Sequence, residues 1–439
     1  MTEFLDFWYN KGISGFIGVF WFYFVIELPR YIFFDYSILL ITYLKKKTGW
    51  QSYKNARRKL WKERPFLSII IPGKDEGKHY QSLVRSLNEQ TYQNFEIIIV
   101  DDGSDDESQY IGRAMERNGE IAMFLRNKDR GGKASAANLA LNHCNGKYVV
   151  HLDADCSFYR DAIEQAMIPF YIRENVGAVG GNLQVRNDED SLCTMLQAIE
   201  YLLYISVGRT VSSSLGILRI VSGAFGIFRK DVLERIKGWD VGPGLDGDLT
   251  IKIRKLGYKI HFEPKAVALT SVPNTFGQLT KQRIRWSRSL VRFRLRKHLD
   301  LFKPNRNFTL SNFASVAESV IYDLLLNLMW YGYIAYIIIN FHQSIGFIMI
   351  AGLGLYTMSK VIEFLVVLML SESWENKLKY IVYLPAMVFY TGYYIRFVRT
   401  WAYFKEFFFR SSYKDSWNPR KTSAEALRIE KSYNKWTDF

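Results

Sequence analysis

Two aspartates separated by one residue, Asp153 and Asp155, follow the strand-forming run at residues 148–152. The alternation of side chains along an extended chain sends both carboxylates to the same side. Two carboxylates in that arrangement repel each other unless a cation lies between them. A divalent ion that prefers oxygen ligands, Mg²⁺ or Mn²⁺, meets this need and also binds phosphate oxygens. An Asp-rich turn after a strand is the plainer interpretation, so the rest of the chain must decide between the two.

Other charged residues follow strand-like runs in the same way. Four apolar runs lie at residues 67–72, 95–100, 121–125 and 148–152, with helix-length segments between them. This spacing predicts a parallel sheet with right-handed crossovers, whose ligands collect beyond the carboxyl ends of the strands. Asp102, Lys133, Asp153 and Asp155 all fall at or just past such ends. Because Lys133 follows two glycines and opens a helix, its surroundings suit a diphosphate, although the full P-loop pattern is missing.

The overall composition indicates a membrane-associated chain. Its 439 residues carry a formal charge of +15, and 16% of them are aromatic. The basic residues are concentrated beside the apolar flanks, which is typical of the cytoplasmic face of a bilayer. No nucleic-acid-binding motif accompanies the positive charge. Three cysteines without paired spacing favour a reduced, cytosolic catalytic domain and argue against disulfides or a zinc site.

The distribution of apolar residues divides the chain into five parts. The stretch at residues 13–44 is long enough for one kinked or tilted crossing plus an interfacial piece, and apolar runs return at 313–341, 345–370 and 378–409. The predicted parts are an N-terminal membrane segment with a basic connector (1–64), a cytosolic catalytic domain (65–270), interfacial amphipathic helices (271–308), C-terminal transmembrane helices (309–412) and a basic cytosolic tail (413–439).

One further motif makes the pattern specific. Gln282, Arg285 and Trp286 form Q-x-x-R-W, and they follow the V-D-D-G-S run at 100–104, the D-A-D at 153–155 and a later aspartate in that order. In these residues the chain resembles the membrane-embedded, processive branch of the family 2 glycosyltransferases. The resemblance covers about 65–300. It implies an α/β, GT-A-like nucleotide-sugar domain flanked by transmembrane and interfacial helices.

The resemblance also implies an activity. Members of this branch are inverting β-glycosyltransferases that polymerise a UDP-sugar with Mg²⁺ or Mn²⁺ and export the polysaccharide through their own helices. UDP-N-acetylglucosamine or UDP-glucose is the expected donor. The other expected partners are the growing polysaccharide, membrane lipids and an accessory or export subunit. A multi-pass protein of the inner membrane is expected. One alternative is a membrane glycosyltransferase that adds a single sugar to a lipid; another is a scaffold or channel with a decayed catalytic domain.

Five residues match family positions that bind the donor. Asp102 corresponds to the aspartate that binds the nucleoside, and Glu76 falls in the loop that touches the uridine. Lys133 matches a lysine that faces the diphosphate. Gln282 and Arg285 are expected near the same diphosphate.

The acceptor side is assigned in the same way. Asp246 best matches the family's general base, and Asp248 stays open as the alternative. Ser222 and Gly223 belong to a loop that resembles the one shaping the acceptor site. Trp286 is expected to stack on the apolar face of the acceptor sugar.

The helix that carries Q-x-x-R-W also has a basic stripe. Lys281, Arg285, Arg288, Arg292 and Arg296 recur at steps of three or four, so they share one face. Two interpretations remain open for this face: a solvated surface, or an interfacial helix lying on anionic lipid.

Overall fold

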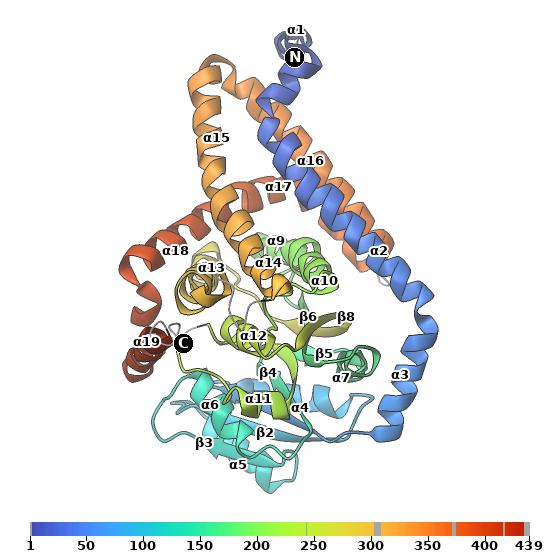
Figure 1. The fold of residues 1–439 in the computed structure, drawn as a ribbon, viewed down its shortest axis with the longest axis vertical. Coiled ribbons are helices and arrows are strands. Elements are labelled where there is room, and N and C mark those ends of the chain that lie inside the picture. The colour runs from blue at the N-terminus through green and yellow to red at the C-terminus, as the bar shows by residue number, and fades with distance from the viewer. Residues whose placement is uncertain (1, 243, 303–308, 371–374, 416–417, 434–439) are drawn as a thin grey trace.

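The computed structural model describes residues 2–242, 244–302, 309–370, 375–415 and 418–433 (Figure 1). Its centre is an eight-stranded mixed sheet in the order β3-β2-β1-β4-β7-β6-β8-β5. The strands are β1 (Leu67–Gly73), β2 (Phe95–Asp101), β3 (Met123–Arg126), β4 (Tyr148–Leu152), β5 (Ser157–Phe158), β6 (Val176–Val185), β7 (Phe225–Arg229) and β8 (Lys259–Thr270).

The predicted parallel half of the sheet is confirmed. Strand β1 pairs in parallel with both β2 and β4, and β2 pairs in parallel with β3. The third strand begins at Met123, two residues later than the apolar run suggests. Beyond β4 the direction changes, because β7 runs antiparallel to both β4 and β6. The carboxyl ends of β1, β2 and β4 therefore share one edge, where the amino end of β7 meets them.

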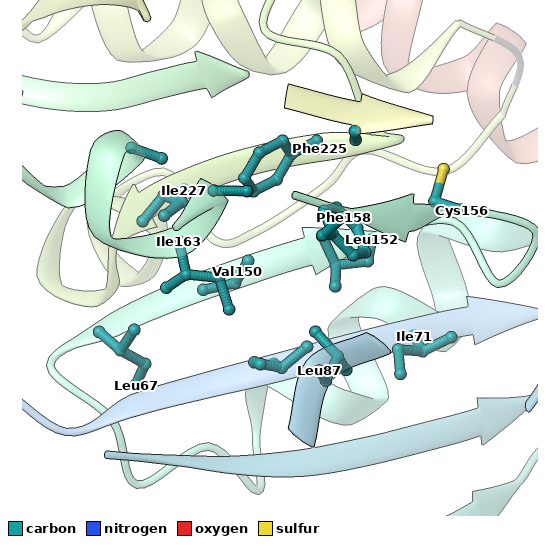
Figure 2. Packing of buried hydrophobic residues seen from close by; sticks show 14 of the residues in the cluster. Leu67, Ile71, Leu87, Val150, Leu152, Cys156, Phe158, Ile163, Phe225 and Ile227 are labelled. Carbon is teal, nitrogen blue, oxygen red and sulfur yellow. The ribbon is translucent and has the colours of Figure 1, made fainter. Parts of the chain in front are cut away.

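Helices cover both faces of the sheet. Within β1, Ile69 and Ile71 face a core that includes Leu83 and Leu87 of a covering helix, whereas Ile70 faces a second core on the opposite side. Figure 2 shows the first core, with side chains from β1, β4 and β7 packed together. Strands with both faces buried read as continuous apolar runs, which is why they were recognisable in the sequence.

The helices fall into two groups. Those packed around the sheet are α4 (Gly77–Asn88), α5 (Ser108–Arg117), α6 (Lys133–Leu141), α7 (Ala162–Met167), α8 (Pro169–Ile172), α11 (Lys230–Arg235) and α12 (Leu245–Lys255). The others are α1 (Thr2–Val19), α2 (Asp35–Thr48), α3 (Trp50–Glu63), α9 (Leu192–Glu200), α10 (Val207–Ser214), α13 (Phe276–Ser289), α14 (Leu310–Glu318), α15 (Leu326–Phe341), α16 (Ile345–Leu370), α17 (Leu384–Phe389), α18 (Ile395–Phe409) and α19 (Arg420–Tyr433).

Among the residues that the structure describes, two helical stretches are long and apolar enough to cross a membrane, Leu310–Leu370 and Glu375–Phe409. A third candidate is the pair Thr2–Val19 and Tyr23–Thr48, which is bent by 62° at the break between them. Figure 1 shows the first stretch reversing its direction between α15 and α16, with α2 beside α16. These long helices extend away from the sheet, as expected for a membrane-anchored α/β domain.

Three of the five stripe residues face the C-terminal segment instead of solvent or lipid, which corrects both interpretations for them, whereas Lys281 at the start of the stripe is exposed. Arg288 lies 3.2 Å from Asp415, and Arg292 donates to the Tyr413 hydroxyl at 3.0 Å. Arg296 pairs with Glu406 of α18. The stripe therefore forms an interface with the C-terminal segment, whose acidic residues are far away in the sequence.

Candidate active site

The two aspartates of the D-A-D run lie just beyond β4, in the middle of the sheet. Lys133, the first residue of α6, forms an ion pair with Asp153. Burial opposes ionisation of Asp153, but the Lys133 charge lowers the pKa of this carboxyl below its usual value. Asp155 forms no ion pair with the described part of the chain, and burial together with the Asp153 charge raises its pKa. Burial and both aspartates also raise the pKa of Glu76 to about 7.

This donor set fits a divalent cation. Three carboxylates feel one another's charge in poorly solvated surroundings, and a bound cation would remove the penalty that raises the pKa values of Glu76 and Asp155. Within the described residues, no three His, Cys, Asp or Glu side chains are grouped to hold a metal without other ligands. Asp153 and Asp155 would therefore supply part of the coordination, with phosphate oxygens supplying more.

Asp102 holds the glycine loop in front of α6. This buried carboxylate accepts hydrogen bonds from the backbone N–H groups of Gly131 and Gly132, at 2.8 and 2.7 Å. Asn127 donates to it as well, at 2.8 Å. Gly132 has φ +87°, a conformation that suits glycine. The loop that leads to Lys133 is thus fixed in shape by a side chain at the end of β2.

Asp246 lies in the first turn of α12 and faces the same region. Its Oδ2 accepts a hydrogen bond from the backbone N–H of Gly223 at 2.8 Å. Burial raises its pKa above the usual value, although Lys133 and the Gly223 N–H act in the opposite direction. A carboxylate with a raised pKa and one oriented oxygen can accept a proton. The Ser222 hydroxyl accepts from the Ala224 N–H at 3.3 Å, which helps to shape the same loop.

Asp248, the alternative base, is fully engaged elsewhere. It lies 2.7 Å from Lys297 Nζ and 2.8 Å from His298 Nε2. All three side chains are buried. Burial opposes ionisation, but these two partners lower the pKa of Asp248 far below its usual value. Such a carboxylate is a poor proton acceptor, so the geometry favours Asp246.

The three residues of the Q-x-x-R-W motif differ in how close they lie to the carboxylates of the site. Arg285 on α13 is close enough to Asp153 for its charge to lower the pKa of that carboxyl. Trp286 is 41% exposed, and the Arg283 guanidinium lies 4.5 Å from its ring. Arg283 is in turn paired with Glu200 at 2.7 Å. The Oε1 of Gln282 is buried without a hydrogen-bond partner among the described residues. The structure therefore brings Arg285 to the carboxylates and leaves Trp286 at the surface.

Three residues of this region were not found from the sequence. His151 on β4 is buried, and its Nδ1 lies 2.5 Å from the Gly223 carbonyl, which ties the strand to the loop that holds Asp246. The positive charge of Arg209 on α10 acts to lower the pKa of Asp246. Thr422 on α19 donates to the Gly131 carbonyl at 2.9 Å. A histidine inside an apolar strand gave a weak signal, whereas the other two belong to no recognisable motif.

Comparison with known proteins agrees with this geometry. Residues 68–237 match the model of glycosyl transferase family 2. The poly-beta-1,6-N-acetyl-D-glucosamine synthase of Staphylococcus epidermidis is 32% identical over 229 residues, which are 50% of this chain and 53% of the relative. The enzyme of the same name from Staphylococcus aureus (strain COL) is 29% identical over 248 residues, 55% of this chain and 58% of the relative. The matched region thus spans little more than half the length of these curated relatives.

Among solved structures, a mannosyltransferase from Pyrobaculum calidifontis in complex with GDP-Man and Mn²⁺ is similar. It is 20% identical, the match covers 92% of this chain and 100% of that one, and the TM-score is 0.49. The predicted α/β, GT-A-like class agrees with the sheet and with the family match. Residues 68–237 of this chain therefore match the glycosyltransferase family 2 domain that the motifs predicted.

Proposed function

We propose that the chain is a processive, inverting β-glycosyltransferase that builds an extracellular polysaccharide from a UDP-sugar. One observation carries this proposal: Lys133 forms an ion pair with Asp153, and Asp246 is held by the Gly223 N–H near enough to both for their charges to shift its pKa, at the carboxyl edge of the domain that matches family 2. These groups come from α6, the end of β4 and α12, which the fold brings to one place. The arrangement supplies both a cationic site for a leaving diphosphate and an anionic proton acceptor.

The donor would bind across the ends of β1, β2 and β4. Lys133, which pairs with Asp153, and Arg285, whose charge lowers the pKa of that carboxyl, would neutralise charge on the departing diphosphate. The glycine loop held by Asp102 positions Lys133 and offers backbone N–H groups at the start of α6. A bound Mg²⁺ or Mn²⁺, held through Asp153 and Asp155, would supply further electrostatic stabilisation of the leaving group.

Asp246 would act as the general base. The proton of an acceptor hydroxyl moves to this carboxylate while the hydroxyl oxygen forms a bond to the anomeric carbon. The bond from that carbon to the diphosphate oxygen breaks, and UDP leaves with the electron pair. The Gly223 N–H occupies Oδ2, so Oδ1 is the oxygen available to take the proton. Attack from the side opposite the diphosphate inverts the anomeric centre.

The polymer product and its export are proposed from the relatives and the helices. The similar staphylococcal proteins are named for a poly-N-acetylglucosamine product, so UDP-N-acetylglucosamine is the first donor to test and UDP-glucose the second. The long apolar helices beside the site would place the catalytic domain on the cytosolic side of the inner membrane. Buried, unpaired Cys144, Cys156 and Cys193 suit a reducing compartment. The polysaccharide would then leave through the protein's own helices.

The test uses the full chain purified in detergent, with Mn²⁺ or Mg²⁺ and a panel of UDP-sugars. We expect UDP release, and a ladder of long products that a linkage-specific hydrolase digests. Asp246→Asn should lower turnover by about 10²–10⁴-fold and leave UDP affinity nearly unchanged. Asp231→Asn, at the opposite edge of the sheet, is the matched control. Single-sugar lipid products would favour the lipid-acceptor alternative, and near-normal turnover of Asp246→Asn would refute the base assignment.

A further inference from the structure

A small cavity lies where the catalytic domain meets the first helix of the C-terminal apolar region. Three arginines line it: Arg219 before β7, Arg254 at the end of α12, and Arg294 in the helical turn that continues α13. Asn312 and Ser315 of α14 complete the polar lining. The space has room for about one water-sized group. None of these five residues has a role in the proposed reaction.

The charges around this cavity do not balance. Among the described residues, a chain of ion pairs that includes Arg219 contains three guanidinium groups and three carboxylates, and two further guanidinium groups line the cavity. The cations are Arg30, Arg219, Arg254, Arg294 and Arg399, and the anions are Asp35, Glu318 and Asp323. All three carboxylates are already shared with the other three arginines, which leaves Arg254 and Arg294 without an ion-pair partner in the described part of the chain.

Arg254 and Arg294 differ in the hydrogen bonds that their guanidinium groups make. Arg254 donates to backbone and side-chain oxygens, among them the Gly216 carbonyl at 2.9 Å and the Asn312 side chain at 3.0 Å. Arg294 is 7% exposed, and its guanidinium makes no hydrogen bond or ion pair with the residues that the structure describes. Burial lowers the pKa of both to about 10, so both stay charged at neutral pH. A buried guanidinium without an anion is costly.

The position of the cavity indicates the kind of anion. Helix α14 begins the apolar stretch Leu310–Leu370, and its first residue, Leu310, is 76% exposed. The cavity therefore lies at the border between the polar domain and the apolar helices. Guanidinium groups bind phosphate through paired hydrogen bonds, and basic pockets at the cytoplasmic ends of membrane helices suit anionic headgroups.

We propose that Arg219, Arg254 and Arg294 form a binding site for a phosphate group, which in the membrane is the headgroup of an anionic phospholipid. One phosphate oxygen enters the cavity toward Arg294, and the rest of the headgroup stays at its mouth. Because α12 carries Asp246 at its other end, the bound headgroup would also hold the base-bearing helix against α14. This site does not depend on the proposed sugar-transfer reaction.

The test measures lipid binding by the full-length protein in a neutral detergent. Native mass spectrometry and thermal unfolding are compared with added phosphatidylglycerol, phosphatidylcholine or inorganic phosphate at matched ionic strength. For the wild type we expect phosphatidylglycerol to bind about tenfold or more tightly than phosphatidylcholine and to raise the unfolding temperature. Arg294→Gln should remove that preference, whereas Arg117→Gln, which removes an exposed arginine from α5, should keep it.

Lipid-free stability gives a second, independent readout. Because Arg294 is a buried charge without a partner, Arg294→Gln should raise the unfolding temperature in the absence of lipid. A stabilised variant that has lost its response to phosphatidylglycerol supports the site. Stabilisation of the wild type, but not of Arg294→Gln, by inorganic phosphate alone supports the phosphate site with a soluble occupant. The proposal is overturned if phosphatidylglycerol and phosphate have no effect, or if both variants respond equally.

Discussion

Gly223→Ala tests how closely the acceptor loop holds the proposed base. A Cβ atom at this position would lie 2.6 Å from Asp246 Oδ1 and 3.3 Å from its Cγ. Ordinary van der Waals contact begins near 3.4 Å, so the carboxylate must retreat by about 0.8 Å. That movement also breaks the 2.8 Å hydrogen bond from the Gly223 N–H. A misplacement of about 1 Å can cost about 10²-fold in rate, so we expect kcat to fall by roughly 30–100-fold.

The assay is steady-state UDP release with the preferred donor, together with UDP affinity from calorimetry. The donor groups Lys133 and Asp153 come from other elements, so UDP affinity should change by less than about threefold. Gly208→Ala on α10 is the matched control, because a Cβ there meets nothing within 4 Å. If Gly223→Ala keeps kcat within about threefold of the wild type, the contact between this loop and Asp246 does not set the position of the base.

Three other predictions follow from the same region. Asp248→Asn removes the charge of one carboxylate that pairs with buried Lys297, while the carboxylate of Asp240 stays 2.6 Å from the same ammonium group. We expect chemical denaturation to show that the free energy of unfolding falls by about 3 kcal/mol. Glu76 binds its proton more tightly in the folded chain, so the metal-free protein should lose stability as pH rises from about 4.5 to about 7. Mn²⁺ affinity should rise over the same range, and Glu76→Gln should flatten both titrations. Glu430→Ala removes the acceptor of the Tyr413 hydroxyl, so limited proteolysis of α19 should become faster; an unchanged cleavage rate would contradict this role for Glu430.

The sequence predicted the parallel half of the sheet well, for a physical reason. Strands buried on both faces are apolar throughout, and each ends where its charged residue begins, as at Asp102 and Asp153. The mixed half, in which β7 runs antiparallel to β4 and β6 while β6 and β8 pair in parallel, was harder to predict. Strand β6 contains Gly177, Gly180 and Gly181, which allow close approach of neighbouring side chains and dilute the apolar pattern. Its place beside β7 depends on pairing between residues that are 46 to 50 positions apart, which no local pattern records.

The proximity of the candidate site residues was predictable where each lies in a local motif, and not where a contact joins distant segments. Asp153, Lys133 and Asp246 each lie in a short recognisable motif. The choice between Asp246 and Asp248 depends on Lys297 and His298, about 50 residues away, and so required the structure. The surroundings of the basic stripe could not be predicted for the same reason, because its acidic partners come from the last part of the chain. Spacing along one helix shows which side chains share a face, but not what covers that face.

The structure separates the two tasks of the proposed reaction between the two halves of the sheet. The parallel half carries the groups for the nucleotide diphosphate, Lys133 and Asp153, on strand ends and a helix start that the core fixes. The base comes from α12 and is oriented by the loop before β7, where the strand direction changes. His151 joins the halves, because it belongs to β4 and contacts the Gly223 carbonyl. A change confined to the loop should therefore alter turnover before donor affinity, and a change at the start of α6 should do the reverse.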